Sequence, residues 1–114
     1  MSKRTSEIHV QVHLDENHVP SNLYWEAEDA NGRGSADSIM LSVWDKNEKN
    51  SLRIDLWTKD MRVDDMKIFF HQQLMSMADT FERATGEDKM AAEMRDFGRF
   101  FGERMEIIRR VEDK

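Results

Sequence analysis

The fold is decided by residues 51–77, SLRIDLWTKDMRVDDMKIFFHQQLMSM, in which the spacing of the apolar residues changes. Every second residue from 52 to 56 is apolar, which is typical of a half-buried strand. From Val63 onward the apolar residues recur at helical spacing, and Asp64 and Asp65 lie in the first turn, where negative charge stabilises a helix. This stretch therefore predicts a strand that leads directly into a long helix.

Three earlier stretches also alternate with a period of two, so we expect four strands in two successive hairpins. They cover residues 7–14, residues 23–28 after Pro20, and residues 38–44. Residues 29–35 contain two glycines and are expected to form a flexible connection. We expect one antiparallel sheet over about residues 6–58, with residues 1–5 disordered.

Two long helices are expected after the sheet, over about residues 63–84 and 87–111. Gly86 falls between them, where a glycine favours a helix end. Each helix carries one apolar stripe, which we assign to the core. The stripes are Val63, Met66, Phe70, Leu74, Met77 and Phe81, and Met90, Met94, Phe97, Phe101, Met105 and Ile108. The predicted fold is a single two-layer α+β domain over residues 1–114, in the order ββββαα, with both helices on one face of the sheet.

Composition limits the classes of partner. The chain has 17 Lys+Arg and 23 Asp+Glu, a formal net charge of -6, and this negative charge argues against binding to nucleic acid or to an anionic membrane. Cysteine is absent, which excludes disulfides and thiolate metal sites. No apolar run is long enough for a membrane span or a signal peptide, so we expect a cytoplasmic protein without membrane insertion.

Some apolar residues of the helices remain outside the two core stripes, and they allow two interpretations. Either the helices use them against each other, or they form a second interface in a homo-oligomer, a dimer or a tetramer. Two glycines four residues apart would allow another backbone to approach closely. The residues of this predicted oligomer interface are Ile68, Met75, Gly98, Phe100, Gly102, Ile107 and Val111.

The face of the sheet opposite the helices is predicted to carry aromatic residues among polar ones. Such residues are typical of protein-binding surfaces, because they offer a large contact area at low entropic cost. The alternative is ordinary cross-strand pairing on a partly solvated sheet. The residues of this predicted protein-interaction face are Tyr24, Met40, Trp44 and Trp57.

Catalytic chemistry is not indicated by any motif, so we predict no enzyme, no catalytic residues, no cofactor and no metal. His9 and His13 share one face of a strand, but four residues separate them by about 13 Å, too far to bind one metal ion. The remaining candidate is a carboxylate-lined pocket between the fourth strand and the first helix. Its polar groups would be Asp55, Asp60 and Asp64, in a small-molecule binder or an unrecognised enzyme.

Several segments together carry a resemblance to a known family: Ser6–Ile8, Leu14–Asn17 through Val19-Pro20, Leu41–Asp45, Ser51–Met61, Arg62–Phe70, Ser76–Thr80 and Arg95–Gly98. They resemble the GldC family of gliding-motility proteins from bacteria of the Bacteroidetes type. The match keeps order and spacing over nearly the whole chain.

This resemblance implies a small soluble accessory protein that is linked to surface gliding and, by association, to the secretion machinery. It implies no known catalytic residues. The order of four strands and two helices is also similar to that of the protein-export chaperone SecB, although no sequence motif is shared. Fold order alone says little about function.

Overall fold

The computed structural model describes residues 4–108. The chain divides into two compact units, Met1–Met61 and Arg62–Lys114, which we describe one at a time. Among the described residues, the first unit contains five strands and the second contains two helices, so the predicted α+β class is confirmed. The predicted single domain, and the predicted packing of the helices on the sheet, stay predictions.

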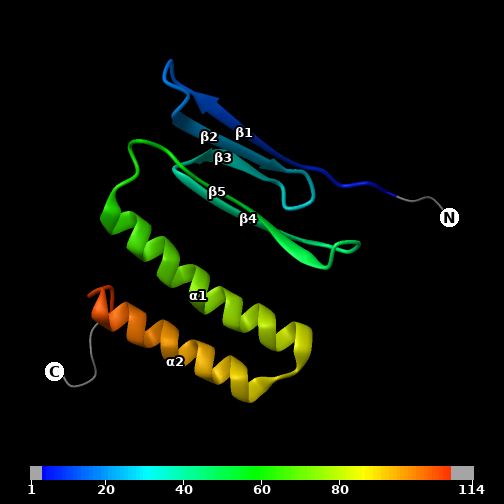
Figure 1. Ribbon diagram of the computed structural model, residues 1–114, viewed down its shortest axis with the longest axis vertical. Coiled ribbons are helices and arrows are strands. Elements are labelled where there is room, and N and C mark those ends of the chain that lie inside the picture. The colour runs from blue at the N-terminus through cyan, green and yellow to red at the C-terminus, as the bar shows by residue number, and fades with distance from the viewer. Residues whose placement is uncertain (1–3, 109–114) are drawn as a thin grey trace. The chain divides into compact units, whose positions relative to one another are not determined.

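The strands of the first unit form two antiparallel sheets rather than one. β1 (Ile8–Leu14), β2 (Pro20–Ala27) and β3 (Gly32–Ala36) make a three-stranded sheet in the order β1-β2-β3. β4 (Ser38–Asp45) and β5 (Asn50–Trp57) make a two-stranded sheet, which we call the ribbon (Figure 1). The prediction of four strands in a single sheet was therefore wrong.

The strand missing from the prediction is β3, where two glycines suggested a flexible connection. Trp25 of β2 pairs with Gly34, and its indole ring lies over both glycines of β3. A Cβ atom placed on Gly32 would lie 2.7 Å from Cη2 of Trp25, so no larger residue fits there without moving the ring. The glycines are therefore strand residues that make room for an aromatic side chain from the neighbouring strand.

The interruption between the two sheets follows from a change in the alternation. In β3 the small residues Gly32, Gly34 and Ala36 share one face, whereas the apolar residues of β4 begin at Ile39, an odd number of positions further on. A strand with a period of two cannot keep Ala36 and Ile39 on one face. The chain bends at Asp37, and pairing resumes with β5 in place of β2.

Hydrogen bonds fix this bend. The N–H of Thr58 donates to the carbonyl oxygen of Asp37 at 2.8 Å, and the Thr58 hydroxyl donates to the Asp37 carboxylate at 3.3 Å. Thr58 is fully buried although it is polar, and these bonds satisfy it. The N–H of Lys59 donates to the carbonyl oxygen of Pro20, so the end of β5 meets the beginning of β2.

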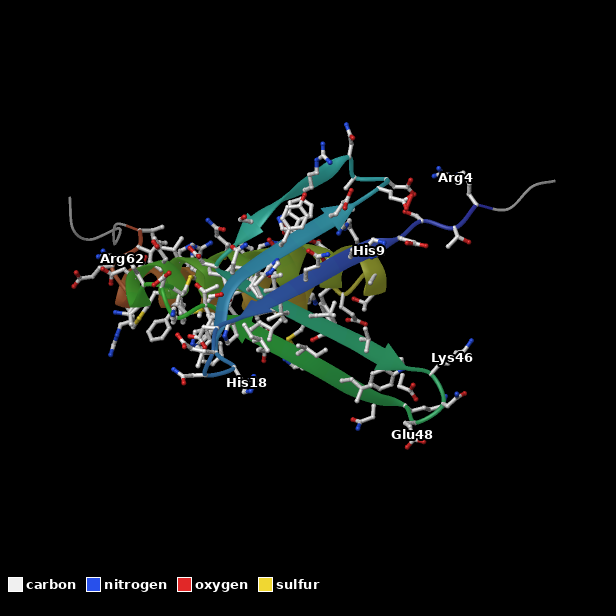
Figure 2. All side chains as sticks on the ribbon, turned by 90° about the horizontal axis from the view of Figure 1, so that it is seen from above. Arg4, His9, His18, Lys46, Glu48 and Arg62 are labelled. Carbon is white, nitrogen blue, oxygen red and sulfur yellow. The ribbon has the colours of Figure 1, made fainter. Side chains whose placement is uncertain are left out.

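Aspartate side chains build two of the turns. Asp15 accepts hydrogen bonds from the N–H groups of Asn17 and Val19, and Asp45 accepts one from the N–H of Glu48. Carboxylates that bond the backbone a few residues ahead are a common way to stabilise turns. His18 lies in the first of these turns, and Lys46 and Glu48 lie at the tip of the ribbon (Figure 2).

The second unit is an antiparallel helical hairpin of α1 (Val63–Thr85) and α2 (Asp88–Arg104). Gly86 has a left-handed conformation (φ 75°) and ends α1, as predicted. The predicted boundary of α2 at residue 111 was wrong. The helix ends at Arg104, and Glu106 is left-handed (φ 59°), a conformation that does not continue a right-handed helix. Val111 and residues 1–3 of the predicted disordered segment lie outside the described residues.

The contact of Trp25 with β3 generates a matched pair of substitutions. Gly32→Ala should destabilise the protein by about 1 kcal/mol, because its Cβ must displace the indole ring. Gly34→Ala should be neutral or stabilising by about 0.5 kcal/mol, since its Cβ would lie 3.8 Å from Nε1 of Trp25. Urea unfolding followed by fluorescence measures both changes. Equal effects of the two substitutions would contradict this account of β3.

Candidate functional site

The aromatic face predicted from the sequence is divided between the two sheets. Met40, Trp44 and Trp57 lie on one face of the ribbon, since Trp44 pairs with Ser51, Met40 with Asp55 and Ser38 with Trp57. Tyr24 belongs to the three-stranded sheet, where it pairs with Gln11 and Ser35. The grouping of Tyr24 with the other three residues depended on a single sheet and was wrong in that respect.

The two tryptophans of the ribbon are exposed and well separated. The exposed fractions are 66% for Trp44 and 57% for Trp57. Trp57 is six residues along β5 from the partner of Trp44, which places the two Cα atoms about 20 Å apart. An ion pair between Arg53 and Asp55, 2.9 Å long, lies between them on the same face. The ribbon therefore offers two aromatic contact points rather than one cluster.

A hollow of about 300 Å³ lies beside Trp57. It is lined by Val19, Pro20, Asp55, Leu56, Trp57 and Lys59. Of the three carboxylates predicted for a pocket in this region, only Asp55 takes part, and it is already paired with Arg53. Asp60 is exposed, and Asp64 lies in the first turn of α1 in the other unit. Among residues 4–108 no three His, Cys, Asp or Glu side chains are grouped as metal ligands would be.

Next to this hollow, Lys59 ties the end of β5 to the first turn. Its ammonium group lies 3.1 Å from the carboxylate of Asp15. The hydrogen bond from the Val19 N–H, followed by that from Lys59, lowers the pKa of the Asp15 carboxyl below its ordinary value. The negative charge of Asp15 is therefore stabilised by the folded structure.

The opposite face of the ribbon carries three aliphatic pairs, followed by the polar pair Asp45 and Asn50 at its end, and the sequence analysis assigned no function to it. Direct cross-strand pairs join β4 and β5 on this face, and four of the six residues are exposed. The alternation of apolar residues in both strands indicated this face, but alternation alone did not show that the face is exposed to solvent. The pairs are Ile39 with Leu56, Leu41 with Ile54, and Val43 with Leu52.

Small residues hold the helical hairpin together. The fully buried residues of the hairpin are Ala78, Ala91, Gly98 and Gly102. A Cβ atom on Gly98 would overlap Met75, and one on Gly102 would lie 2.8 Å from Nε2 of His71. Three residues of the predicted oligomer interface, Met75, Gly98 and Gly102, therefore contact the other helix of the same chain. The close approach predicted at the two glycines is made by α1.

The exposed large apolar residues of the hairpin lie beside this contact, whereas Met75 takes part in it. An α-helix turns by 100° per residue. On each helix, the exposed stripe therefore lies about 100° around the helix axis from the residues that contact the other helix, and the direction of rotation is the same on both helices. Because the helices are antiparallel, both stripes lie on one side of the hairpin. Seven of the twelve residues that we assigned to the core are exposed: Val63, Phe70, Met77, Met90, Phe97, Met105 and Ile108.

The remaining residues of the predicted oligomer interface point elsewhere. Ile68 and Phe100 are exposed and lie outside the two stripes, and Ile107 is half-buried in the turn after α2. The Phe100 ring lies 5.9 Å from that of Phe97, and the guanidinium of Arg104 lies 5.6 Å from its centroid. Phe97 and Phe100 are thus the two most exposed aromatic side chains of α2.

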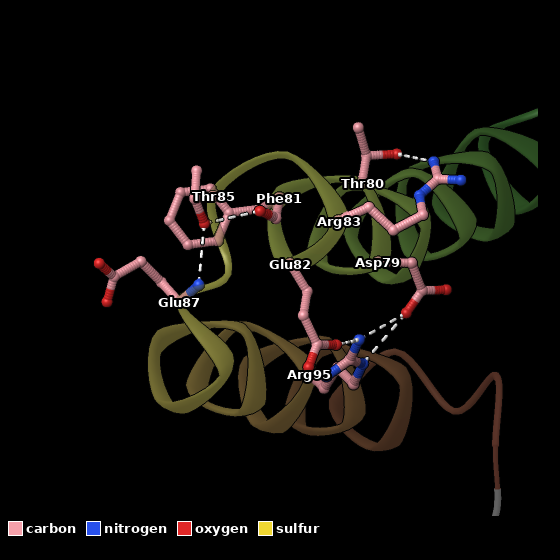
Figure 3. A network of polar contacts seen from close by, with 8 residues as sticks. All are labelled: Asp79, Thr80, Phe81, Glu82, Arg83, Thr85, Glu87 and Arg95. Atoms are coloured by element: carbon pink, nitrogen blue, oxygen red, sulfur yellow. Dashed lines mark hydrogen bonds and ion pairs between the residues drawn. The ribbon is translucent and has the colours of Figure 1, made fainter.

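Arg95 joins the two helices through ion pairs (Figure 3). Its guanidinium lies 2.6 Å from Glu82 and 2.8 Å from Asp79, both on α1. The two carboxylates, Glu82 first, raise the pKa of Arg95 further above its ordinary value. The Arg95 guanidinium bonds both carboxylates, and Arg83 donates to the Thr80 hydroxyl, so this network stabilises the hairpin.

The fold and these surfaces define a class: a small α+β protein with two antiparallel sheets, a helical hairpin and extensive exposed apolar surface. No helix within residues 4–108 combines the length and apolar character required to cross a bilayer. The model of a protein family described as "Gliding motility-associated protein GldC-like" matches residues 20–107. The chain therefore belongs to this GldC-like family. The resemblance predicted from the sequence is thereby confirmed, although the segments before Pro20 lie outside the match. Neither a curated protein nor a solved structure matches the chain significantly.

The lowered pKa of Asp15 predicts a pH dependence of stability. Asp15→Asn keeps a side-chain oxygen for the N–H groups of Asn17 and Val19 but removes the charge that faces Lys59. A carboxyl whose pKa falls on folding stabilises the folded state above its unfolded pKa, and this contribution is lost as the pH falls through the folded value. The wild type should therefore unfold at higher urea than Asp15→Asn at pH 6, and the two midpoints should converge in acid, once the pH has fallen below the lowered pKa of the folded state. A constant difference between the midpoints at all pH values would contradict this role of the charge.

Proposed function

We propose that this chain is a non-enzymatic accessory protein of bacterial gliding motility in the Bacteroidetes type of bacterium. It acts in the cytoplasm through protein–protein interaction, as a homo-oligomer, and serves a protein of the motility or secretion machinery in a chaperone-like manner. Membership of the GldC-like family supports the association with motility. The mode of action is argued from the exposed apolar surface.

The observation that carries the proposal is the amount of this surface. Within residues 4–108, twenty large apolar side chains have exposed fractions between 37% and 76%. Monomeric soluble proteins rarely expose contiguous apolar patches of this kind, which mark protein-interaction sites. The exposed residues are grouped on defined faces of the ribbon, of β1 and of the hairpin, as binding surfaces require.

The negative charge of the chain supports selective rather than general adhesion. A net charge of -6 repels other copies of the protein and most acidic proteins at long range. Only a partner whose surface makes matching apolar contacts is therefore bound. Aromatic contacts such as Trp44 and Trp57 supply much of the binding energy in interfaces of this kind.

The helix part of the proposed oligomer interface is tested by charge substitution. Phe100→Glu together with Ile107→Glu should break the helix contact and lower the mass of the oligomer in sedimentation velocity, because burying a carboxylate without a partner is unfavourable. Met90→Glu is the control, since Met90 is equally exposed (49% against 51% for Phe100) but lies on the stripe of α2. An unchanged mass of the double variant, or dissociation by Met90→Glu alone, would place the interface elsewhere.

The aromatic face of the ribbon is tested by partner capture. Trp44→Ala with Trp57→Ala should abolish co-purification of motility or secretion proteins from the native bacterium, while circular dichroism stays unchanged because both residues are exposed. Leu52→Ala is the matched control on the other face, with an exposed fraction of 56%. Capture that survives the double substitution would exclude this face as the binding surface.

A second candidate is a small-molecule binder that uses the hollow beside Trp57. Its volume of about 300 Å³ is at the lower limit of ligand pockets, and Lys59 and Asp55 supply its polar groups. An indole ring in the wall makes the candidate directly testable, because a bound molecule would change the fluorescence of Trp57. A screen that leaves this fluorescence unchanged would remove the candidate.

A further inference from the structure

The outer edge of β4 has no partner strand within residues 4–108, because β4 pairs only with β5. Two hydrogen bonds show which residues turn their backbone groups toward β5. The carbonyl oxygens of Asp37 and Asp45 accept from the N–H groups of Thr58 and Lys49, both at 2.8 Å. The register between them has no irregularity, and backbone groups alternate along an antiparallel strand.

The odd-numbered residues of β4 therefore bond to β5, and the even-numbered residues direct their N–H and C=O groups outward. These are Ser38, Met40, Ser42 and Trp44. Proteins usually protect such an edge with a charge, a proline or a bulge. Ser38 to Trp44 contains none of these, whereas β5 carries Arg53 and Asp55. A ribbon of two strands is also rarely stable without a further strand.

We propose that β4 pairs antiparallel with β4 of a second copy of this chain across a two-fold axis. Two ribbons then become one four-stranded sheet, with β4 and its copy in the centre. Even-numbered residues must face even-numbered residues for the outward groups to bond, so the axis passes through a residue, and Leu41 and Ser42 are the two nearest to the middle of β4.

Charge selects between these two registers. With Leu41 on the axis, Asp37 would lie opposite Asp45 of the second copy, and like charges directly opposite are destabilising. With Ser42 on the axis, Met40 lies opposite Trp44 and Leu41 opposite Val43, so each contact occurs twice and no like charges meet. Three pairs of residues then exchange about six backbone hydrogen bonds. The edge is thus complementary to itself, which favours a second copy over an unrelated peptide.

This inference rests on the proposed function only because both take the protein to be a homo-oligomer. The contact between the two β4 strands is separate from the proposed contact between helices. It also doubles the aliphatic face of the ribbon, since the cross-strand pairs of both copies lie on one sheet.

A single cysteine tests the register, because the chain has none of its own. Ser42→Cys should form a disulfide-linked dimer under mild oxidation, since residues opposite each other across the axis have Cα atoms about 5.5 Å apart. Ser51→Cys is the control, because Ser51 is exposed on β5, away from the outer edge of β4. Leu41→Cys would form the disulfide preferentially if the rejected register, with Leu41 on the axis, were the true one. Equal crosslinking of Ser42→Cys and Ser51→Cys, or preferred crosslinking through Leu41→Cys, would overturn the assignment.

A proline tests the edge itself in the otherwise unmodified chain. Ser42→Pro removes an N–H group that points outward and leaves the bonds between β4 and β5 in place, so the β4 contact should be lost and the mass in sedimentation should fall while circular dichroism is kept. Ser42→Ala should keep the wild-type mass. A monomeric wild type, or an unchanged mass of a folded Ser42→Pro variant, would overturn the proposal. Should Ser42→Pro not fold, the cysteine variants decide.

These measurements use purified protein alone, so their failure leaves the capture of a motility partner unaffected. Loss of partner capture by Trp57→Ala in a variant that still dimerises would in turn bear on the proposed function only, because Trp57 lies at the far end of β5 from the axis.

Discussion

Burial of apolar surface is the interaction on which the fold of a chain of this size depends most. Within residues 4–108, the largest apolar side chain that is fully buried is Leu23, and the hairpin is closed by alanine and glycine. Small side chains let two helices approach closely, but they remove little apolar area from water, and the hydrophobic contribution scales with that area. The larger side chains lie next to these contacts and stay available for other surfaces.

Polar contacts then fix the local geometry that apolar burial leaves undefined. Thr58 holds the bend at Asp37, Lys59 holds the first turn through Asp15, and Arg95 holds the two helices through Asp79 and Glu82. Exposed ion pairs contribute little to the free energy of unfolding. Each of these, however, joins segments that are distant in sequence, so their main effect is on which segments lie together.

Local patterns predicted the elements well, and contacts between distant segments explain the differences. Gly86 and the period of the apolar residues located the helical hairpin, and the parity of Met40, Trp44 and Trp57 placed them on one face. The strand at Gly32 was missed because the glycine is needed there to make room for the Trp25 ring, which comes from another strand. The two glycines of α2 indicated a close approach, but nothing local in the sequence distinguishes α1 of the same chain from another chain.

The ribbon combines these features in one small element, because its two faces and its edge have different chemistry. One face carries the three aliphatic pairs, the other carries Trp44 and Trp57, and the edge of β4 is uncharged from Ser38 to Trp44. Pairing along the edge uses backbone groups and leaves both faces of the sheet accessible. A dimer formed in this way presents each aromatic contact point twice, and a partner with two matching sites would be held more tightly without any new contact. In the proposed dimer, assembly and partner binding would therefore reinforce each other, since they use different sides of the same two strands.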